Sequence, residues 1–206
     1  MDLAAERLYR AFRRYRKPRS LGLCTPHCVP ARLVASLLRV DRRELGAEDF
    51  AAYVGEVAYA GDDEFGYFLP RLLELHPWDG LGKASGVLLR VGTHPWSPTE
   101  SAALDGFHLD RWRRVLADPG ADAVAFLADA RVARPTAAPF LRAWEEDTSD
   151  TAIGHLAEFV ERHPFGVYEF EDGWDHEVSA WLPGYPVEVF TGRDDHPEAQ
   201  DITLSW

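Results

Sequence analysis

The apolar residues of this chain recur at helical spacing in short blocks, and Pro or Gly lies between the blocks. In the first block Leu8, Phe12 and Tyr15 fall at i, i+4 and i+7, which gives an opening helix one apolar face. Pro18 ends that helix, because proline has no backbone N–H to donate inside a helix. Short helices of this kind stack as hairpins. We therefore expect a mainly α-helical fold of about eight to ten short helices, arranged as a bundle or a short solenoid.

The same spacing predicts further helices at 31–39, 50–57, 61–75, 98–116, 118–134, 139–144 and 149–160. Ser97 begins the most clearly marked helix, with Pro98 in its first position and Glu100 three residues after the cap. Pro70 marks either a kink or the first turn of a new helix. Residues 76–97 contain four Gly and two Pro, and we expect them to form a linker or an irregular segment.

The C-terminal part has a mixed pattern. Residues 167–170 and 185–191 are rich in β-branched and aromatic residues, so short strands are expected there, whereas residues 174–182 suit a helix equally well. We treat residues 1–206 as a single domain with three parts. These are a basic amphipathic helix at 1–19, a helical body at 20–165 and an acidic, aromatic C-terminal section at 166–206.

The sequence lacks the features that mark membrane and secreted proteins. No apolar run approaches the ~20 residues that span a bilayer, and the N-terminal residues do not have the layout of a signal peptide. Two cysteines are too few for a disulfide scaffold. We therefore expect a cytoplasmic protein with reduced thiols and no membrane partner.

The net charge of -12 is unevenly distributed along the chain. Residues 1–43 carry 11 Lys+Arg against 3 Asp+Glu, and the remainder carries 11 against 31. A basic segment on an acidic chain can bind nucleic acid or a membrane, or it can dock on the acidic part of its own chain or of a second copy. We favour docking, because the many carboxylates compete with phosphate for the same arginines.

Four stretches resemble a family of uncharacterised bacterial proteins. They are the dipeptide His27–Cys28, the run Glu44–Tyr53, the segment Asp63–Leu75 with its Phe-Leu-Pro-Arg core, and His155–Glu158. The resemblance spans roughly residues 20–165 and implies a bacterial, cytoplasmic, mainly helical protein. It implies no reaction, because the family has no assigned activity.

Cys24, His27 and Cys28 place two thiols and an imidazole within five residues. Thiolate and imidazole are ligands that zinc prefers, so these residues are a candidate metal site. A fourth ligand would come from elsewhere, such as His76, His94, His108 or a water molecule. Two alternatives stay open: buried structural cysteines with a capping histidine, and a redox pair of thiols.

The carboxyl groups of the 62–75 stretch form a second candidate. Asp62, Asp63, Glu64 and Glu74 lie near His76 in sequence, and carboxylates on neighbouring helices can hold two metal ions. We favour the simpler interpretation that the first three form an acidic first turn, which complements the helix dipole. Arg71 is expected to pair with Glu74 or Glu44, and anion recognition is its alternative role.

The N-terminal helix is a candidate nucleic-acid binder. Arg10, Arg13 and Arg14 could straddle phosphates while the interleaved aromatic residues face the body of the protein. A docking helix with a solvated basic face explains the same pattern, and we favour it for the reason given above.

These observations favour a protein-binding module of the adaptor or immunity type with an acidic interaction surface. Its partner would be another protein or a second copy of the chain. A small metalloprotein or metalloenzyme using Cys24, His27 and Cys28 is the alternative, and a nucleic-acid binder is the second alternative. We find no nucleophile motif and no phosphate-binding glycine loop, so the sequence names no reaction.

Overall fold

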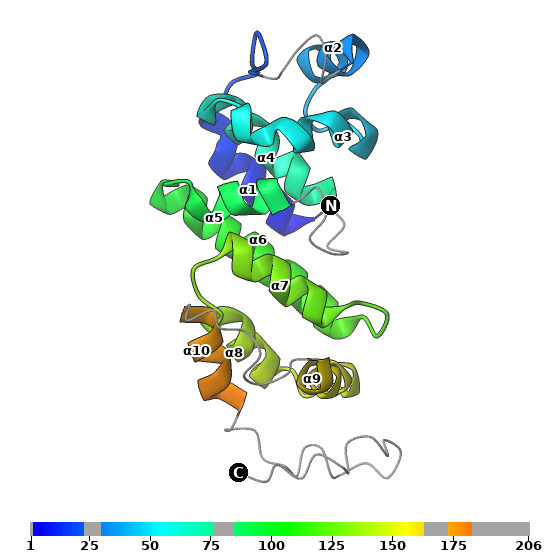
Figure 1. Cartoon of the computed structure of the whole chain (residues 1–206), viewed down its shortest axis with the longest axis vertical. Coiled ribbons are helices and arrows are strands. Elements are labelled where there is room, and N and C mark those ends of the chain that lie inside the picture. Colours follow the sequence, from blue (N-terminus) through cyan, green and yellow to red (C-terminus); the bar gives the residue numbers. More distant parts are fainter. Residues whose placement is uncertain (1, 23–29, 76–84, 163–172, 183–206) are drawn as a thin grey trace.

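The protein is mainly helical, as expected. In a computed structural model, residues 2–22, 30–75, 85–162 and 173–182 are described, and within these ranges there are ten α-helices, two 3₁₀ helices and no strand (Figure 1). The elements are α1 (Leu3–Ala11), η1 (Phe12–Arg14), α2 (Ala31–Arg39), α3 (Ala47–Glu56), η2 (Val57–Tyr59), α4 (Asp62–Leu75), α5 (Ser85–Thr93), α6 (Pro98–Ala117), α7 (Ala123–Ala133), α8 (Ala138–Glu146), α9 (Asp150–Arg162) and α10 (Gly173–Trp181). None of these helices is long and apolar enough to cross a membrane.

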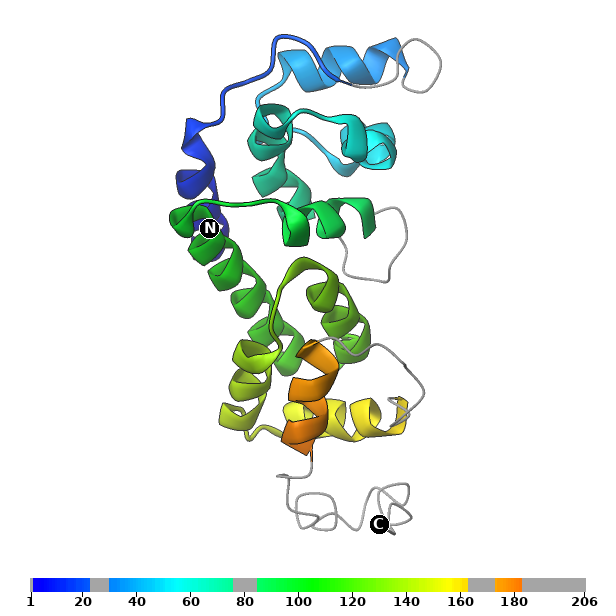
Figure 2. The same ribbon diagram turned by 60° about the vertical axis from the view of Figure 1, so that its left-hand side comes forward.

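Helix α6 joins the two halves of the molecule. It has 20 residues, a length of about 30 Å, and runs from the half that contains α1 to α5 into the half that contains α7 to α10 (Figure 2). Its start is the expected capping box: the Ser97 hydroxyl accepts from the Glu100 N–H, and Glu100 Oε2 accepts from the Ser97 N–H at 2.9 Å. Helices α1, α7, α8 and α9 all pack on α6.

Helix α1 lies along α6 and is shorter than expected. Asp2 caps it through bonds from the N–H groups of Ala4 and Ala5, and Leu8 and Phe12 are fully buried. The helix ends at Ala11, followed by η1, so the expected end at Pro18 was wrong. The backbone becomes extended at Tyr15. The Tyr15 ring lies against Gly66 of α4, where a Cβ would come within 2.7 Å of the ring.

Helix α4 passes through Pro70 without a break, so of the two expectations the new first turn was wrong. Proline offers no N–H to the carbonyl of Gly66 and loosens the turn before it. In that turn Arg42 donates to the carbonyl oxygen of Tyr67 at 2.8 Å. A side chain from outside the helix thus supplies a hydrogen bond where proline weakens the helix.

Two further segments differ from expectation. Residues 85–93 form α5, whereas an irregular segment was expected; residues 76–84 lie outside the described ranges. Helix α7 begins at Ala123 with Asp122 as its cap, because Asp118 instead closes a turn by accepting from the N–H of Gly120 at 2.9 Å. Side-chain bonds to nearby backbone groups favour turns over helix in this way.

The C-terminal part is described only at α10, which settles residues 173–181 as helix. The strand expectations at 167–170 and 185–191 lie outside the described residues.

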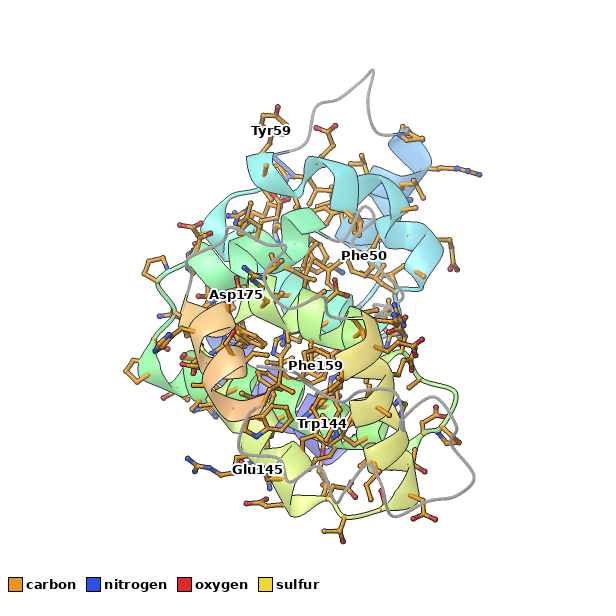
Figure 3. The ribbon with its side chains drawn as sticks, turned by 60° about the horizontal axis from the view of Figure 1, so that its bottom comes forward. Phe50, Tyr59, Trp144, Glu145, Phe159 and Asp175 are labelled. Atoms are coloured by element: carbon orange, nitrogen blue, oxygen red, sulfur yellow. The ribbon has the colours of Figure 1, made fainter. Side chains whose placement is uncertain are left out.

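An aromatic cluster fills the core of the α6–α10 half. The Trp112 ring stacks on Phe126 at 5.2 Å and meets Trp144 edge-on at 5.1 Å, while its indole N–H donates to the carbonyl of Phe140 at 2.9 Å. Trp144 in turn meets Phe159 of α9, and Figure 3 shows the two rings together. One fully buried indole therefore connects α6, α7 and α8.

The closest approach between helices α5 and α7 requires a glycine. A Cβ on Gly92 would lie under 3.0 Å from the carbonyl oxygen of Val132, and this oxygen belongs to the backbone of α7, which cannot shift as a flexible side chain can.

We expect Gly92→Ala to lower the free energy of unfolding by about 1–3 kcal/mol. Gly106→Ala in α6 is the matched control, because a Cβ there meets nothing within 4 Å; it should raise stability by about 0.5–1 kcal/mol. Urea unfolding of both variants measures this, and equal effects would contradict the packing described.

Candidate functional site

A buried carboxyl group lies in the first turn of α4. Glu64 is only 8% exposed, and its Oε2 accepts a hydrogen bond from the N–H of Gly22 at 2.8 Å. Burial raises the pKa of Glu64, while the Gly22 N–H, the Tyr53 hydroxyl and the Arg90 guanidinium oppose that rise. Gly22 fits tightly, since a Cβ there would come within 2.9 Å of the Tyr59 carbonyl oxygen. Glu64 therefore holds the backbone two residues before Cys24.

The second oxygen of this carboxyl group faces another buried polar group. Tyr53 is fully buried, and burial together with the neighbouring Glu64 raises the pKa of its hydroxyl. Neither Glu64 Oε1 nor the Tyr53 hydroxyl completes a hydrogen bond with another described residue. Buried, imperfectly paired carboxyls with a raised pKa concentrate at functional sites, although structural clusters produce them as well.

Arg90 of α5 lies near the buried carboxyl group and contacts the residues around it. Its guanidinium lies over the Phe65 ring at 4.4 Å and donates to the Val57 carbonyl at 2.6 Å and to Asp62 at 2.8 Å. Asp62 also lies 3.6 Å from Nδ1 of His94. The start of α4 thus carries one buried acid, Glu64, and two exposed acids, Asp62 and Asp63, and Arg90 of α5 binds the first of the exposed pair.

The predicted metal ligands Cys24, His27 and Cys28 lie outside the described residues. Within the described ranges no group of three or more His, Cys, Asp and Glu side chains is placed to hold a metal ion, so the candidate carboxylate site is not formed there. Asp62, Asp63 and Glu64 instead form the acidic first turn of α4 that was favoured. Asp62 and Glu74 bind arginines.

Two of the proposed fourth ligands are described. His94 stacks on Trp96 with 4.1 Å between ring centroids. His108 is fully buried; its Nδ1 donates to the Leu104 carbonyl at 2.8 Å, and burial lowers its pKa to about 4. His76 lies outside the described residues. His108 is therefore a neutral core residue across the ordinary pH range.

Arg71 forms the expected ion pair with Glu74, at 2.8 Å. Its Nε donates to the Leu45 carbonyl, and the Glu74 oxygen that it contacts also accepts from the Tyr9 hydroxyl at 2.9 Å. Arg71 thus connects α4 to α1 and to the loop before α3. Its role in anion binding stays a prediction.

The N-terminal arginines divide into two groups. Arg14 bonds to Glu100 and to the Tyr15 hydroxyl, so it fastens the N-terminal segment (residues 2–22) to α6. Arg10 and Arg13 are exposed and form no ion pair with another described residue. The aromatic residues between them are buried, which leaves no ring on this surface for stacking on nucleic-acid bases.

Glu177 is a functional side chain that the sequence analysis missed. Helix α8 has Ala137 at its N-cap position, which offers no side-chain cap. Glu177 of α10 supplies it: Oε2 accepts from the N–H groups of Ala137 and Ala138 at 2.6 and 2.8 Å, and from the Thr136 hydroxyl at 2.7 Å. The only signal in the sequence was a predicted helix start with no capping residue before it, because such a start needs a cap from elsewhere in the chain.

Three further polar contacts hold α10 in place. The Trp174 indole donates to the Arg134 carbonyl at 2.8 Å, the Trp181 indole donates to Glu145 at 2.9 Å, and Asp175 pairs with Arg131 at 2.8 Å. The Trp174 ring also packs on Phe140 and the Trp181 ring on Trp144. We call the surface that receives these contacts the α10 docking face; it comprises Arg131, Arg134, Thr136–Ala138, Phe140, Trp144 and Glu145.

The negative charge of the chain is concentrated in the C-terminal third of the sequence. Residues 138–206 carry 3 Lys+Arg and 16 Asp+Glu, whereas residues 1–137 carry 19 and 18. The described part of the acidic stretch forms α8, α9 and α10, which lie together at the lower end in Figure 1. We call this the acidic end. Its exposed carboxylates Glu146 and Glu161 form no ion pair with another described residue.

No family model, curated protein or solved structure matches this chain. The resemblance described from the sequence stays a prediction.

The buried carboxyl group predicts a pH dependence of stability. A raised pKa means that the fold favours the protonated form, so stability falls as pH rises from the unfolded value of about 4.3 through the folded value. Glu64→Gln stays neutral, so its stability relative to the wild type should rise as the pH is raised above the unfolded value of about 4.3. Glu64→Ala, which removes the acceptor of the Gly22 N–H, should cost about 1–3 kcal/mol. Urea unfolding across pH measures both, and a constant difference between wild type and Glu64→Gln would contradict the assignment.

Proposed function

We propose that this chain is a cytoplasmic protein-binding module of the adaptor or immunity type, and that its acidic end binds a basic partner protein. The observation that carries the proposal is the segregation of charge: residues 1–137 are nearly neutral, and residues 138–206 hold 16 carboxylates against 3 cations. A single-sign surface raises the association rate with a partner of opposite charge and repels others.

The cations within the acidic end do little to cancel this charge. Arg162 bonds to Glu158 at 2.7 Å and to Asp122 at 3.1 Å, so it is already shared between two carboxylates. Exposed pairs of this kind contribute little to stability, which leaves the acidic surface free to serve recognition.

Nucleic-acid binding by the N-terminal segment has weaker support. Its rings are buried, and Arg14 and Lys17 bond to Glu100 and to backbone carbonyls of the same chain. The exposed Arg10 and Arg13 would contact phosphates without reading bases.

A charge-reversal pair tests the protein-binding function. We expect Glu146→Lys/Glu161→Lys to lower the amount of protein that the immobilised full chain captures from a bacterial lysate and releases with salt, by about tenfold. Glu44→Lys/Glu56→Lys changes the net charge equally at the other end of the molecule and should leave capture unchanged. Mass spectrometry quantifies the released proteins. Equal capture by both variants would contradict the acidic end as the binding surface.

A metalloprotein using Cys24, His27 and Cys28 is the second candidate. One specific observation favours it: the buried carboxyl group of Glu64 accepts from the N–H of Gly22, two residues before Cys24. Cys24 follows Gly22 by two positions in the sequence, so this candidate function joins the Glu64 carboxyl group and the Cys24 thiol in one ligand set. A carboxylate oxygen beside thiolates and an imidazole is a ligand set that zinc accepts.

Metal content decides this candidate. Protein purified without chelator or nickel affinity should contain about one zinc or iron per chain. Cys24→Ser/Cys28→Ser should lose the metal and Glu64→Gln should lower its occupancy, whereas Asp63→Asn, at the neighbouring exposed acid, should leave it unchanged. Elemental analysis measures all four proteins. A well-folded wild type without metal would rule the candidate out.

A further inference from the structure

We propose that the α10 docking face is a helix-binding site, and that an amphipathic helix of a basic partner protein binds there by displacing α10. The inference rests on the proposed function, because it takes the acidic end as the place where a partner protein binds. It adds the structural class of the partner and the pattern of residues that the partner presents.

The residues of α10 that contact the docking face recur at helical spacing. Trp174, Glu177, Val178 and Trp181 fall at i, i+3, i+4 and i+7 of α10, and each of them is wholly or partly buried. This is the pattern by which a short amphipathic helix binds a surface on another protein. The remaining positions show the opposite face: Gly173, His176, Ser179 and Ala180 are exposed.

The second argument is the chemistry of the face itself. The N-terminus of α8 presents two backbone N–H groups and the Thr136 hydroxyl, and Glu177 receives all three. The helix dipole adds to the attraction for a carboxylate at this point. Aromatic rings of Phe140 and Trp144 receive the two indoles on either side. A helix with an acid at i+3 between aromatic residues at i and i+7 therefore meets complementary groups at each anchor.

The third argument is that α10 depends on docking for its own structure. It has nine residues, and isolated helices shorter than about 12 residues are marginal in water. It contacts Arg131 of α7, the residues that join α7 to α8, and α8 itself. These hydrogen bonds, the ion pair and the ring contacts of the α10 docking face hold it in place.

The fourth argument is the charge around the face. The acidic residues of α10 are Asp175 and Glu177, and the exposed carboxylates Glu145 and Glu146 of the adjoining helix α8 repel further negative charge. A partner helix with the same anchors and Lys or Arg on its outer face gains an attraction that α10 does not have. This additional electrostatic attraction allows a partner helix to compete with α10, which belongs to the same chain as the face.

The test uses the full chain and fluorescein-labelled synthetic peptides of residues 173–182, read by fluorescence anisotropy. One peptide has the native sequence, and the other carries His176→Lys, Ser179→Lys and Ala180→Lys on the exposed face. The lysine peptide should bind the wild-type chain at least about tenfold more tightly than the native peptide at low salt. Glu177→Ala within the lysine peptide should weaken binding at least about tenfold, because the N–H groups of α8 lose their acceptor.

Chain variants provide the competition experiment. Full-length Trp174→Ala/Glu177→Ala, with its own α10 weakened, should bind the native peptide at least about tenfold more tightly than the wild type. Full-length Ser179→Ala, altered on the exposed face, should match the wild type. Equal, weak binding by all three chains would overturn the proposal. Wild-type dimers that Glu177→Ala abolishes would also overturn it, in favour of a second copy as the occupant.

Hydrogen exchange on the wild-type chain keeps the proposal testable if the double variant does not fold. The amides of α10 should exchange well before those of α6, and exchange of both only on global unfolding would overturn the inference. The proposed function is tested separately. If salt-dependent capture by the acidic end persists while both peptides fail to bind, the function stands and the docking inference falls.

Discussion

The packing of α1 along α6 is the interaction on which the rest of the structure depends. The two helices run in opposite directions and are fastened at both ends, by Asp2 with Arg114 and by Arg14 with Glu100. Between these ion pairs the buried face of α1 supplies Leu8 to the core. With α1 in place the following chain passes close to α4, which is how the backbone before the cysteine segment reaches Glu64.

Much of the fold follows from local signals. The capping box at Ser97 and the bounds of α2 were predicted from the sequence because the residues that determine them lie within a few positions. The errors have tertiary causes. The end of α1 depends on the ring of Tyr15 meeting a glycine of α4, and the helicity of residues 85–93 depends on packing against α7 at Gly92. Periodicity in a short window does not contain either contact.

The candidate sites also combine contacts between sequence neighbours, which could be predicted, with contacts between distant residues, which could not. The pair of Arg71 with Glu74 was predictable, because residues three apart on a helix are neighbours. The burial of Glu64 was not, since its partner Gly22 is 42 residues away. Glu177 was harder still: it caps a helix that starts 39 positions earlier in the chain, and only the missing cap at Ala137 hinted at it. Polar groups that act across long separations are those that a sequence shows least.

The fastening of α1 to α6 also has a consequence for how the chain folds as it is synthesised. Asp2 and Arg114 are separated by 112 positions, so α1 lacks its main packing partner until α6 has left the ribosome. At 5–20 residues per second that interval is roughly 5–20 s. During it the first helix exposes leucine and phenylalanine beside a row of arginines, a combination that suits chaperone binding. Helix α1 is therefore translated well before its native surroundings on α6 exist.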